Sequence, residues 1–360
     1  MRIAVISTPF VRVPPNGYGG TELFCGQLAE ALVERGHEVT LFATGDSQFS
    51  GQVAACFPTA TWPPSESVDR AHVRFCLHEI SRDRQGYDAV QINSALGLKV
   101  ARDLGIPVVY TLHHHYEEKL SRVYAAHPEV HYVAISQRQL DREAPLRHAT
   151  VIYHGIKVDD YPLSRRDEGY VLHLGRFARE KGTHLAIDAA IAAKTPIVVA
   201  GRVHENPDDQ EYFDTELVSR FNLPGVLLGG EAGHRRKVAL MQQARAVLCP
   251  ILWEEPFGLV AIEAMLTGTP VIGFARGSLP EIIDDGITGI LVSDVQEMTR
   301  AIALAAQLDR EACAARARER FSSERMAADY ERVFDAIVRR RSAPVLVAEP
   351  MPARQTRLIG

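Results

Sequence analysis

Cysteine is scarce in this chain, and long apolar runs are absent. Five cysteines occur among 360 residues, without the spacing of a metal-binding pair, which indicates reduced thiols in a cytosolic protein. No run of about 18 apolar residues is present, so we expect no membrane-spanning helix, and the start MRIAVISTPF lacks the apolar core of a signal peptide. The net charge of −5 provides no basic field for nucleic acid. We therefore expect a cytoplasmic protein, free or peripheral to a membrane.

Two nucleotide-binding motifs of other enzyme classes are missing too. No G-x-x-x-x-G-K-[ST] phosphate loop occurs, and in the glycine loop PPNGYGGTELF, Glu22 stands where a dinucleotide fingerprint needs its third glycine. This argues against a nicotinamide dehydrogenase. What remains in the loop is Gly19-Gly20, where backbone can approach a ligand closely, followed by Thr21 as a candidate helix cap.

Short β-branched runs alternate with helical patterns along most of the chain, which is typical of doubly wound parallel sheets. The alternation breaks at a polar, turn-rich segment near residues 156–168 and then restarts. The sequence therefore predicts two Rossmann-like α/β domains, 1–160 and 168–321. An amphipathic, mostly exposed helix is expected at 322–341, packing back on the first domain, and a loose tail at 342–360. Ligands of such sheets bind at the carboxyl ends of the strands, so we expect a ligand cleft between the domains.

Glu263 interrupts an otherwise apolar helix, LVAIEAML. A buried carboxylate needs partners, because an unpaired one costs several kcal/mol. Two hypotheses are open: a buried ion pair or cap, and a carboxylate that accepts hydrogen bonds from ribose hydroxyls. Glu255 stands on the loop before the helix, which Pro256 and Gly258 shape. Open N–H groups at this helix end favour an anion.

The segment GRFAREKG places Arg176 and Lys181 on a strand-to-helix loop. Two cations beside a positive helix end favour a diphosphate site, and the alternative is an ordinary solvated loop. Three histidines, His113 to His115, follow a strand. Consecutive side chains on extended backbone point to opposite faces, so a substrate contact by one of them is favoured over a metal site.

Together these motifs resemble the retaining glycosyltransferases of family 4, which have the GT-B fold. The strongest marker is E-x7-E, from Glu255 to Glu263, and the resemblance covers about residues 1 to 335. Its other motifs are GRFAREKG, GTPVIG, RGSLPEIIDDGITGILV, the glycine loop, TLH, AIS at Ala134–Ser136 and VIYHGI.

The resemblance implies roles at matching positions. Glu263 would accept from the ribose, Glu255 would lie beside donor-sugar hydroxyls, and the base would be read by backbone near residues 229–235. The implied catalytic residues are His113, Glu255, Arg176 and Lys181. The implied donor-binding residues are Gly19, Gly20, Arg176, Lys181, Glu255, Phe257, Gly258, Leu259, Val260 and Glu263.

The predicted activity is transfer of a hexose from a UDP- or GDP-sugar to a hydroxyl of a sugar, a lipid-linked sugar or a small molecule. No D-x-D motif occurs, so no metal and no cofactor are expected. The chain departs from the family at Tyr153 and His154, where Pro and Asn are usual, and at Gln91 and Asn93, where histidines are common. The alternatives are a nucleotide-sugar epimerase, a sugar phosphorylase and a non-catalytic nucleotide-sugar-binding protein.

Overall fold

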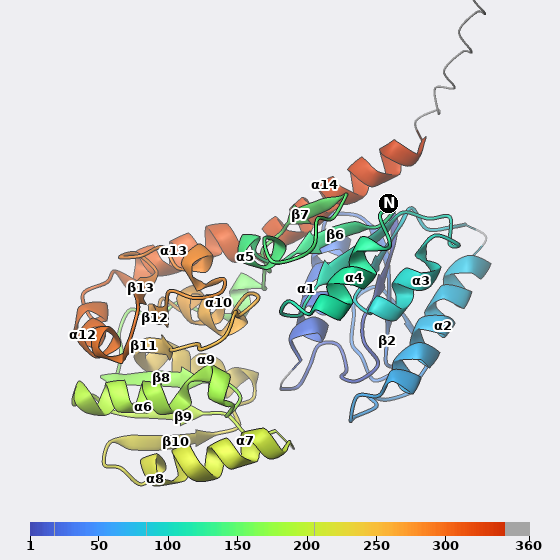
Figure 1. The fold of residues 1–360 in the computed structure, drawn as a ribbon. Helices are drawn as coiled ribbons and strands as arrows, with labels where there is room; N and C mark the ends of the chain where they lie inside the picture. The colour runs from blue at the N-terminus through green and yellow to red at the C-terminus, as the bar shows by residue number, and fades with distance from the viewer. Residues whose placement is uncertain (18, 84, 205, 343–360) are drawn as a thin grey trace, which may run out of the picture.

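Two parallel β-sheets form two lobes that stand side by side, joined across one end by the carboxy-terminal helices (Figure 1). The computed structural model describes residues 1–342 except 18, 84 and 205. The predicted architecture of two Rossmann-like α/β domains is confirmed. No helix in this described part of the chain is both long and apolar enough to cross a membrane.

The amino-terminal lobe has a seven-stranded sheet in the order β3-β2-β1-β4-β5-β6-β7. Its central strands are apolar runs buried on both faces, as expected for a parallel sheet covered by helices. The strands are β1 Arg2–Ile6, β2 Glu38–Ala43, β3 Gln52–Ala55, β4 Ala89–Ile92, β5 Val108–Leu112, β6 His131–Ala134 and β7 Ala149–Val151. The helices are α1 Gly20–Glu34, α2 Glu66–Arg82, η1 Ala95–Gly97, α3 Leu98–Ala101, α4 Glu118–Ala125 and α5 Gln137–Leu140.

One helix of this lobe is shorter than its sequence pattern suggests. The pattern ALGLKVARDLG favours a helix over residues 95–105, but only the single turn η1 and the short α3 form. The chain then turns, with the Gly105 N–H 3.4 Å from the Arg102 carbonyl oxygen, because β5 must begin only a few residues later.

The carboxy-terminal lobe has a six-stranded sheet in the order β10-β9-β8-β11-β12-β13. The strands are β8 Tyr170–Leu174, β9 Ile197–Ala200, β10 Val226–Gly230, β11 Ala244–Cys249, β12 Val271–Phe274 and β13 Gly289–Val292. The single-turn helices η2 Val158–Asp160 and η3 Arg179–Lys181 precede α6 Thr183–Ala192. The others are α7 Pro207–Tyr212, the π-helical turn η4 Phe213–Leu217, α8 Val218–Phe221, α9 His234–Gln243, α10 Leu259–Leu266, α11 Leu279–Ile282, α12 Val295–Ala305 and α13 Arg310–Phe321.

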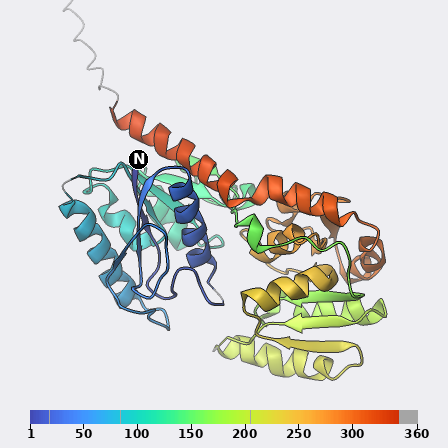
Figure 2. The same ribbon diagram turned by 180° about the vertical axis from the view of Figure 1, so that it is seen from behind.

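The last helix, α14 Ser323–Ser342, leaves α13 and runs along α1 of the amino-terminal lobe (Figure 2). On one face of this amphipathic helix, α1 covers a stripe of apolar side chains. Four of these are fully buried in the core of the amino-terminal lobe: Met326, Ala327, Tyr330 and Phe334.

The chain crosses between the lobes twice, and the two crossings lie against each other. Ile156 donates its N–H to the Phe321 carbonyl at 2.9 Å and accepts from the Ser323 N–H at 3.1 Å. A Cβ on Gly155 would lie only 2.1 Å from the Ser322 carbonyl oxygen, so only glycine allows this close approach. These contacts hold the two crossings together at the junction of the lobes.

Candidate active site

Lys181 and Glu255 meet at the carboxyl ends of β8 and β11. The Lys181 ammonium pairs with Glu255 Oε2, which also accepts from Trp253 Nε1 at 2.7 Å. The ammonium lies 4.9 Å from the centroid of a Trp253 ring, within the range of a cation–π contact. The two loops touch because Gly182 allows it: a Cβ there would lie 2.1 Å from the Pro250 carbonyl oxygen, and its φ is 69°.

Arg176, the other predicted cation, has different partners. Its guanidinium pairs with Glu180 and lies 3.4 Å from Asp209 Oδ2. About a quarter of its side chain is exposed, at 26%, close to the 22% of Lys181. Both cations are therefore reachable from solvent, but each is balanced by a carboxylate.

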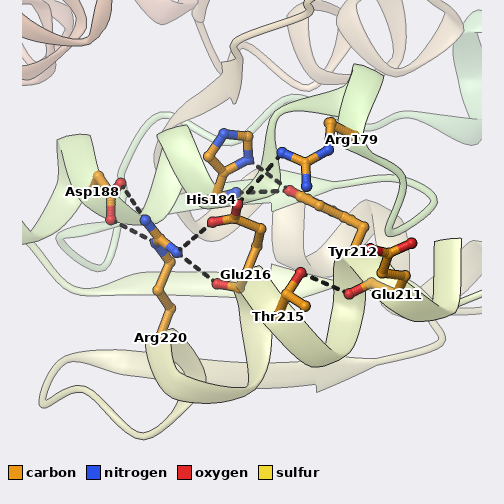
Figure 3. Close-up of polar contacts among 8 residues, drawn as sticks. All are labelled: Arg179, His184, Asp188, Glu211, Tyr212, Thr215, Glu216 and Arg220. Atoms are coloured by element: carbon orange, nitrogen blue, oxygen red, sulfur yellow. Dashed lines mark hydrogen bonds and ion pairs between the residues drawn. The ribbon is translucent and has the colours of Figure 1, made fainter. Parts of the chain in front are cut away.

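A helical stretch behind this loop ties it to the lobe (Figure 3). Arg179 lies 3.4 Å from Glu216, which sits in the π-helical turn η4. Nearby, the Arg220 guanidinium forms two hydrogen bonds to the carboxylate of Asp188 in α6, at 2.9 and 3.0 Å. The loop that carries Arg176 and Lys181 is thus held by Glu216 through Arg179 and by Asp209 through Arg176.

Glu263 lies in α10 and is 2% exposed. Its Oε1 pairs with the Lys237 ammonium of α9 and accepts from the Tyr161 hydroxyl at 2.7 Å. The structure therefore contains the buried ion pair of the first hypothesis, while the role of Glu263 at a ribose stays a prediction. The sequence analysis did not single out these two partners. Lys237 is one of several cations at the start of a helix, and Tyr161 lies in the linker.

The first turn of α10, beside these residues, has no side-chain cap in the described part of the chain. Gly258 is its N-cap, with φ 98°. The turn's N–H groups, which include those of Leu259 and Val260, therefore lack intrahelical partners. Phe257 is buried and its ring packs edge-on to His154, 4.9 Å between centroids.

His113 is the predicted site residue on the amino-terminal side. Its Nε2 lies 2.7 Å from Asn93 Oδ1, and its ring stacks on His154 at 5.6 Å. Burial, then His154 and His114, hold the pKa of His113 well below its usual range, so the ring is neutral. His114 and His115 are exposed, and His115 packs on Trp253 across the cleft. The described residues include no group of three or more His, Cys, Asp or Glu that could hold a metal ion.

The glycine loop lies against the opposite lobe. A Cβ on Gly20 would be 3.6 Å from Leu259 Cδ1, and one on Gly17 would be 3.7 Å from Glu231 Oε1. Gly19 is enclosed by its own loop, since a Cβ there would meet Glu22 and Pro15 at 3.0 Å. The structure thus brings Gly20 to the start of α10, where Gly258 to Val260 lie.

Glu281 joins the lobes beside the site and was not singled out from the sequence. Its carboxylate accepts from the backbone N–H groups of Gln137 and Arg138 at 2.7 and 2.6 Å, and from the Tyr153 hydroxyl at 3.1 Å. These amides open helix α5, so the carboxylate also acts as a charge at a helix amino terminus. Arg138 adds an ion pair with Glu254 at 2.8 Å.

Two family models match the chain, and they meet at the linker. The model described as "Glycosyltransferase Family 4" matches residues 18–160, and "Glycosyl transferases group 1" matches residues 159–321.

Curated relatives agree with these matches. The glycogen synthase of Mycobacterium tuberculosis is 30% identical over 195 residues, covering 52% of this chain and 46% of that protein. The chain therefore spans about half the length of that relative. The D-inositol 3-phosphate glycosyltransferase of Mycobacterium avium is 28% identical over 368 residues, covering 84% of each.

Solved structures share the fold. The sucrose-phosphate synthase of Thermosynechococcus elongatus superposes with a TM-score of 0.77 at 21% identity, over 94% of this chain and all of that one. Anabaena HepE in complex with UDP and glucose gives 0.72 at 19% identity, over 93% of this chain and all of that one. The predicted GT-B fold and family are thus confirmed, and the chain belongs to the family 4 glycosyltransferases.

Proposed function

We propose that this protein is a retaining glycosyltransferase, which moves a hexose from a UDP- or GDP-sugar to an acceptor hydroxyl. The observation that carries the proposal is the cluster of Lys181, Glu255 and Trp253 at the open amino terminus of α10. The cluster combines a cation, a helix end and a carboxylate, which suit a diphosphate and the hydroxyls of a sugar.

The leaving group of this reaction is a nucleoside diphosphate, whose negative charge grows as the sugar bond breaks. Lys181, Arg176 and the first N–H groups of α10 would stabilise that charge. The diphosphate would take over the Lys181 ammonium from Glu255, and the freed carboxylate would accept from sugar hydroxyls. Because the cations are already held in place by carboxylates, little reorganisation is needed when the charge develops.

Glu263 would bind the ribose with the oxygen that its structural partners leave free. Lys237 and Tyr161 both bond to Oε1, so Oε2 is available for ribose hydroxyls in the proposed complex. The carboxylate would then serve the fold with one oxygen and the donor with the other. Gly19, Gly20 and His113 would meet the donor from the amino-terminal lobe.

A thermal-shift panel of UDP, GDP, ADP and their sugars tests donor binding. UDP-glucose is the first choice, since HepE binds UDP and glucose. A ligand at about 100 times its Kd stabilises the fold by about 2.7 kcal/mol. No shift with any of these ligands would contradict the proposal.

Turnover assays separate the proposal from its rivals. Donor is incubated with sugars, lipid-linked sugars and D-inositol 3-phosphate, and free nucleoside diphosphate is measured. We expect release that depends on an acceptor and a product with retained configuration. An epimerase would consume donor without acceptor, a phosphorylase would require phosphate, and a binding protein would release nothing.

A further inference from the structure

A chain of neutral polar side chains lies beneath His113 in the amino-terminal lobe. His113 Nε2 is 2.7 Å from Asn93 Oδ1, and the Asn93 and Gln91 amides bond to each other reciprocally at 2.8 and 2.9 Å. Gln91 Nε2 also donates to Thr111 Oγ1 at 3.0 Å, and that hydroxyl bonds to Tyr330 of α14 at 2.8 Å. Gln91 and Asn93 are the positions where histidines are common in the family.

The orientation of the Asn93 amide follows from one of its partners. The Ile6 carbonyl oxygen lies 2.8 Å from Asn93 Nδ2, and a carbonyl can only accept, so the amide nitrogen must face Ile6. Oδ1 then faces His113. Because Oδ1 can only accept, the proton of the His113 ring must reside on Nε2.

We propose that Asn93 is a positioning residue that locks His113 as the Nε2–H tautomer and so presents Nδ1 as a hydrogen-bond acceptor in the cleft. The proposal rests on the proposed function only in taking a hydroxyl of the donor sugar as the group that bonds to Nδ1. Within the described chain, no side chain or backbone group is hydrogen-bonded to Nδ1. Asn93 is held in turn by Gln91, which bonds through the Thr111 hydroxyl to Tyr330. This network links the site to α14.

The surroundings of His113 keep the ring neutral as well as oriented. His154 stacks on it from the segment after β7, and His114 follows it in the chain. Burial, and then the charge of Arg325 in α14, lower the pKa of His154 to about 3. On the α1 side, Phe24 packs edge-on at 4.9 Å. No carboxylate bonds to His113 in the described structure, so no partner favours the imidazolium.

Nitrogen-15 NMR of histidine-labelled protein tests the tautomer directly, without turnover. The His113 signals are assigned by their loss in His113→Gln. We expect the wild type to show only the Nε2–H form between about pH 5.5 and 8.5, where an ordinary histidine titrates. In Asn93→Ala, we expect a mixture of tautomers. An Nδ1–H form in the wild type, or an Asn93→Ala spectrum identical to the wild type, would overturn the proposal.

A pH profile then tests the consequence for catalysis. Asn93→Asp keeps an acceptor at His113 but adds a negative charge, which raises the pKa of the ring and puts a proton on Nδ1. We expect kcat/KM for the donor to fall about tenfold per pH unit below the raised pKa, while the wild type shows no such fall. Asn222→Asp is the control, since it adds the same charge in the other lobe, at an exposed amide that donates to the Val218 carbonyl.

The outcomes separate this inference from the proposed function. A profile of folded Asn93→Asp that coincides with the wild type would refute the role of Asn93. If the NMR result is as expected but no donor is turned over, the tautomer lock stands and the proposed function fails. If Asn93→Asp does not fold, the wild-type and Asn93→Ala spectra still decide the matter.

Discussion

The two faces of the candidate site, one from each lobe, are built from opposite kinds of polar groups. On the carboxy-terminal side the groups are ion pairs: Lys181 with Glu255, Arg176 with Glu180, and Lys237 with Glu263. On the amino-terminal side they are neutral, with His113 resting on a network of amides and hydroxyls. The difference fits a donor whose diphosphate needs charge and whose sugar needs orientation.

A site can hold cations before its anion binds if each cation is paired with a carboxylate. An unpaired buried cation would cost several kcal/mol, so each cation is balanced by a carboxylate, and in the proposed complex a diphosphate would replace that carboxylate at Lys181. A neutral network has no such cost, and its geometry depends on each donor meeting an acceptor. Changes on the charged face should therefore affect stability and turnover strongly, whereas the neutral face should respond to geometry and proton position.

The largest effect is expected from Glu263→Gln. The change leaves the Lys237 ammonium without its counter-charge inside the lobe. We expect the free energy of unfolding to fall by about 3 kcal/mol, the lower end for a broken buried pair, because the Lys237 side chain is 19% exposed and can turn to water. Urea denaturation measures it. The double variant with Lys237→Met should recover most of the loss, and a single variant as stable as the wild type would show that the pair is not structural.

The next effect is on catalysis at Lys181. Lys181→Ala should lower kcat by about 10²–10³-fold, the usual cost of losing one preorganised donor of positive charge. Arg176→Ala should behave similarly, and the double variant should fall short of additivity because both act on one diphosphate. Arg179→Ala is the matched control, since Arg179 lies in the same turn but is 59% exposed and pairs with Glu216.

Steady-state kinetics at saturating donor decide this prediction. A folded Lys181→Ala that keeps more than about a tenth of the wild-type kcat would remove Lys181 from the leaving-group site. An Arg179→Ala defect as large as that of Lys181→Ala would indicate that the loop, and not the charge of Lys181, matters.

A smaller effect should follow from loosening the two faces from each other. Glu281→Ala removes three hydrogen bonds between the lobes, and because two of them are exposed to solvent, water can take the place of the lost acceptor and the stability of each lobe should change little. We expect the lobes to separate, with a larger radius of gyration in solution scattering and a higher KM for the donor. Glu281→Gln, which keeps one acceptor oxygen, should be intermediate. An unchanged radius with and without nucleoside diphosphate would contradict a role in closure.

The effect that is smallest at neutral pH, and that appears only in acid, concerns a neutral group buried on the charged side. His173 of β8 is 2% exposed, and burial lowers its pKa to about 4. Below about pH 6.5 this histidine takes up a proton in the unfolded state but not in the folded state. The free energy of unfolding therefore decreases as the pH is lowered from about 6.5 to about 4, by about 1.4 kcal/mol per pH unit. His173→Gln removes this group, so the slope of the free energy of unfolding against pH should decrease by the uptake of one proton. Equal slopes for the two proteins would show that His173 is not neutral in the fold.

Much of the fold was predictable because its signals are local. The strands β1, β2, β8 and β9 are short runs rich in β-branched residues, the pattern from which the sequence predicted parallel sheets. Helix α2, at Glu66–Arg82, was not predicted, since its mean hydropathy is low and only a few of its side chains are buried. The buried face of α14 was underestimated because its apolar residues alternate with charged ones.

The sequence by itself determined most of the strands and which loops carry Lys181, Glu255 and His113, because both depend on patterns among near neighbours. It also held the family motifs, since their residues stand in a fixed order. Only the tertiary structure decided the partners: Glu255 for Lys181, Lys237 for Glu263, Asn93 for His113, and Glu281 across the lobes. These pairs join positions from different strands and different lobes, and a hydrogen bond depends on distances that no local pattern contains.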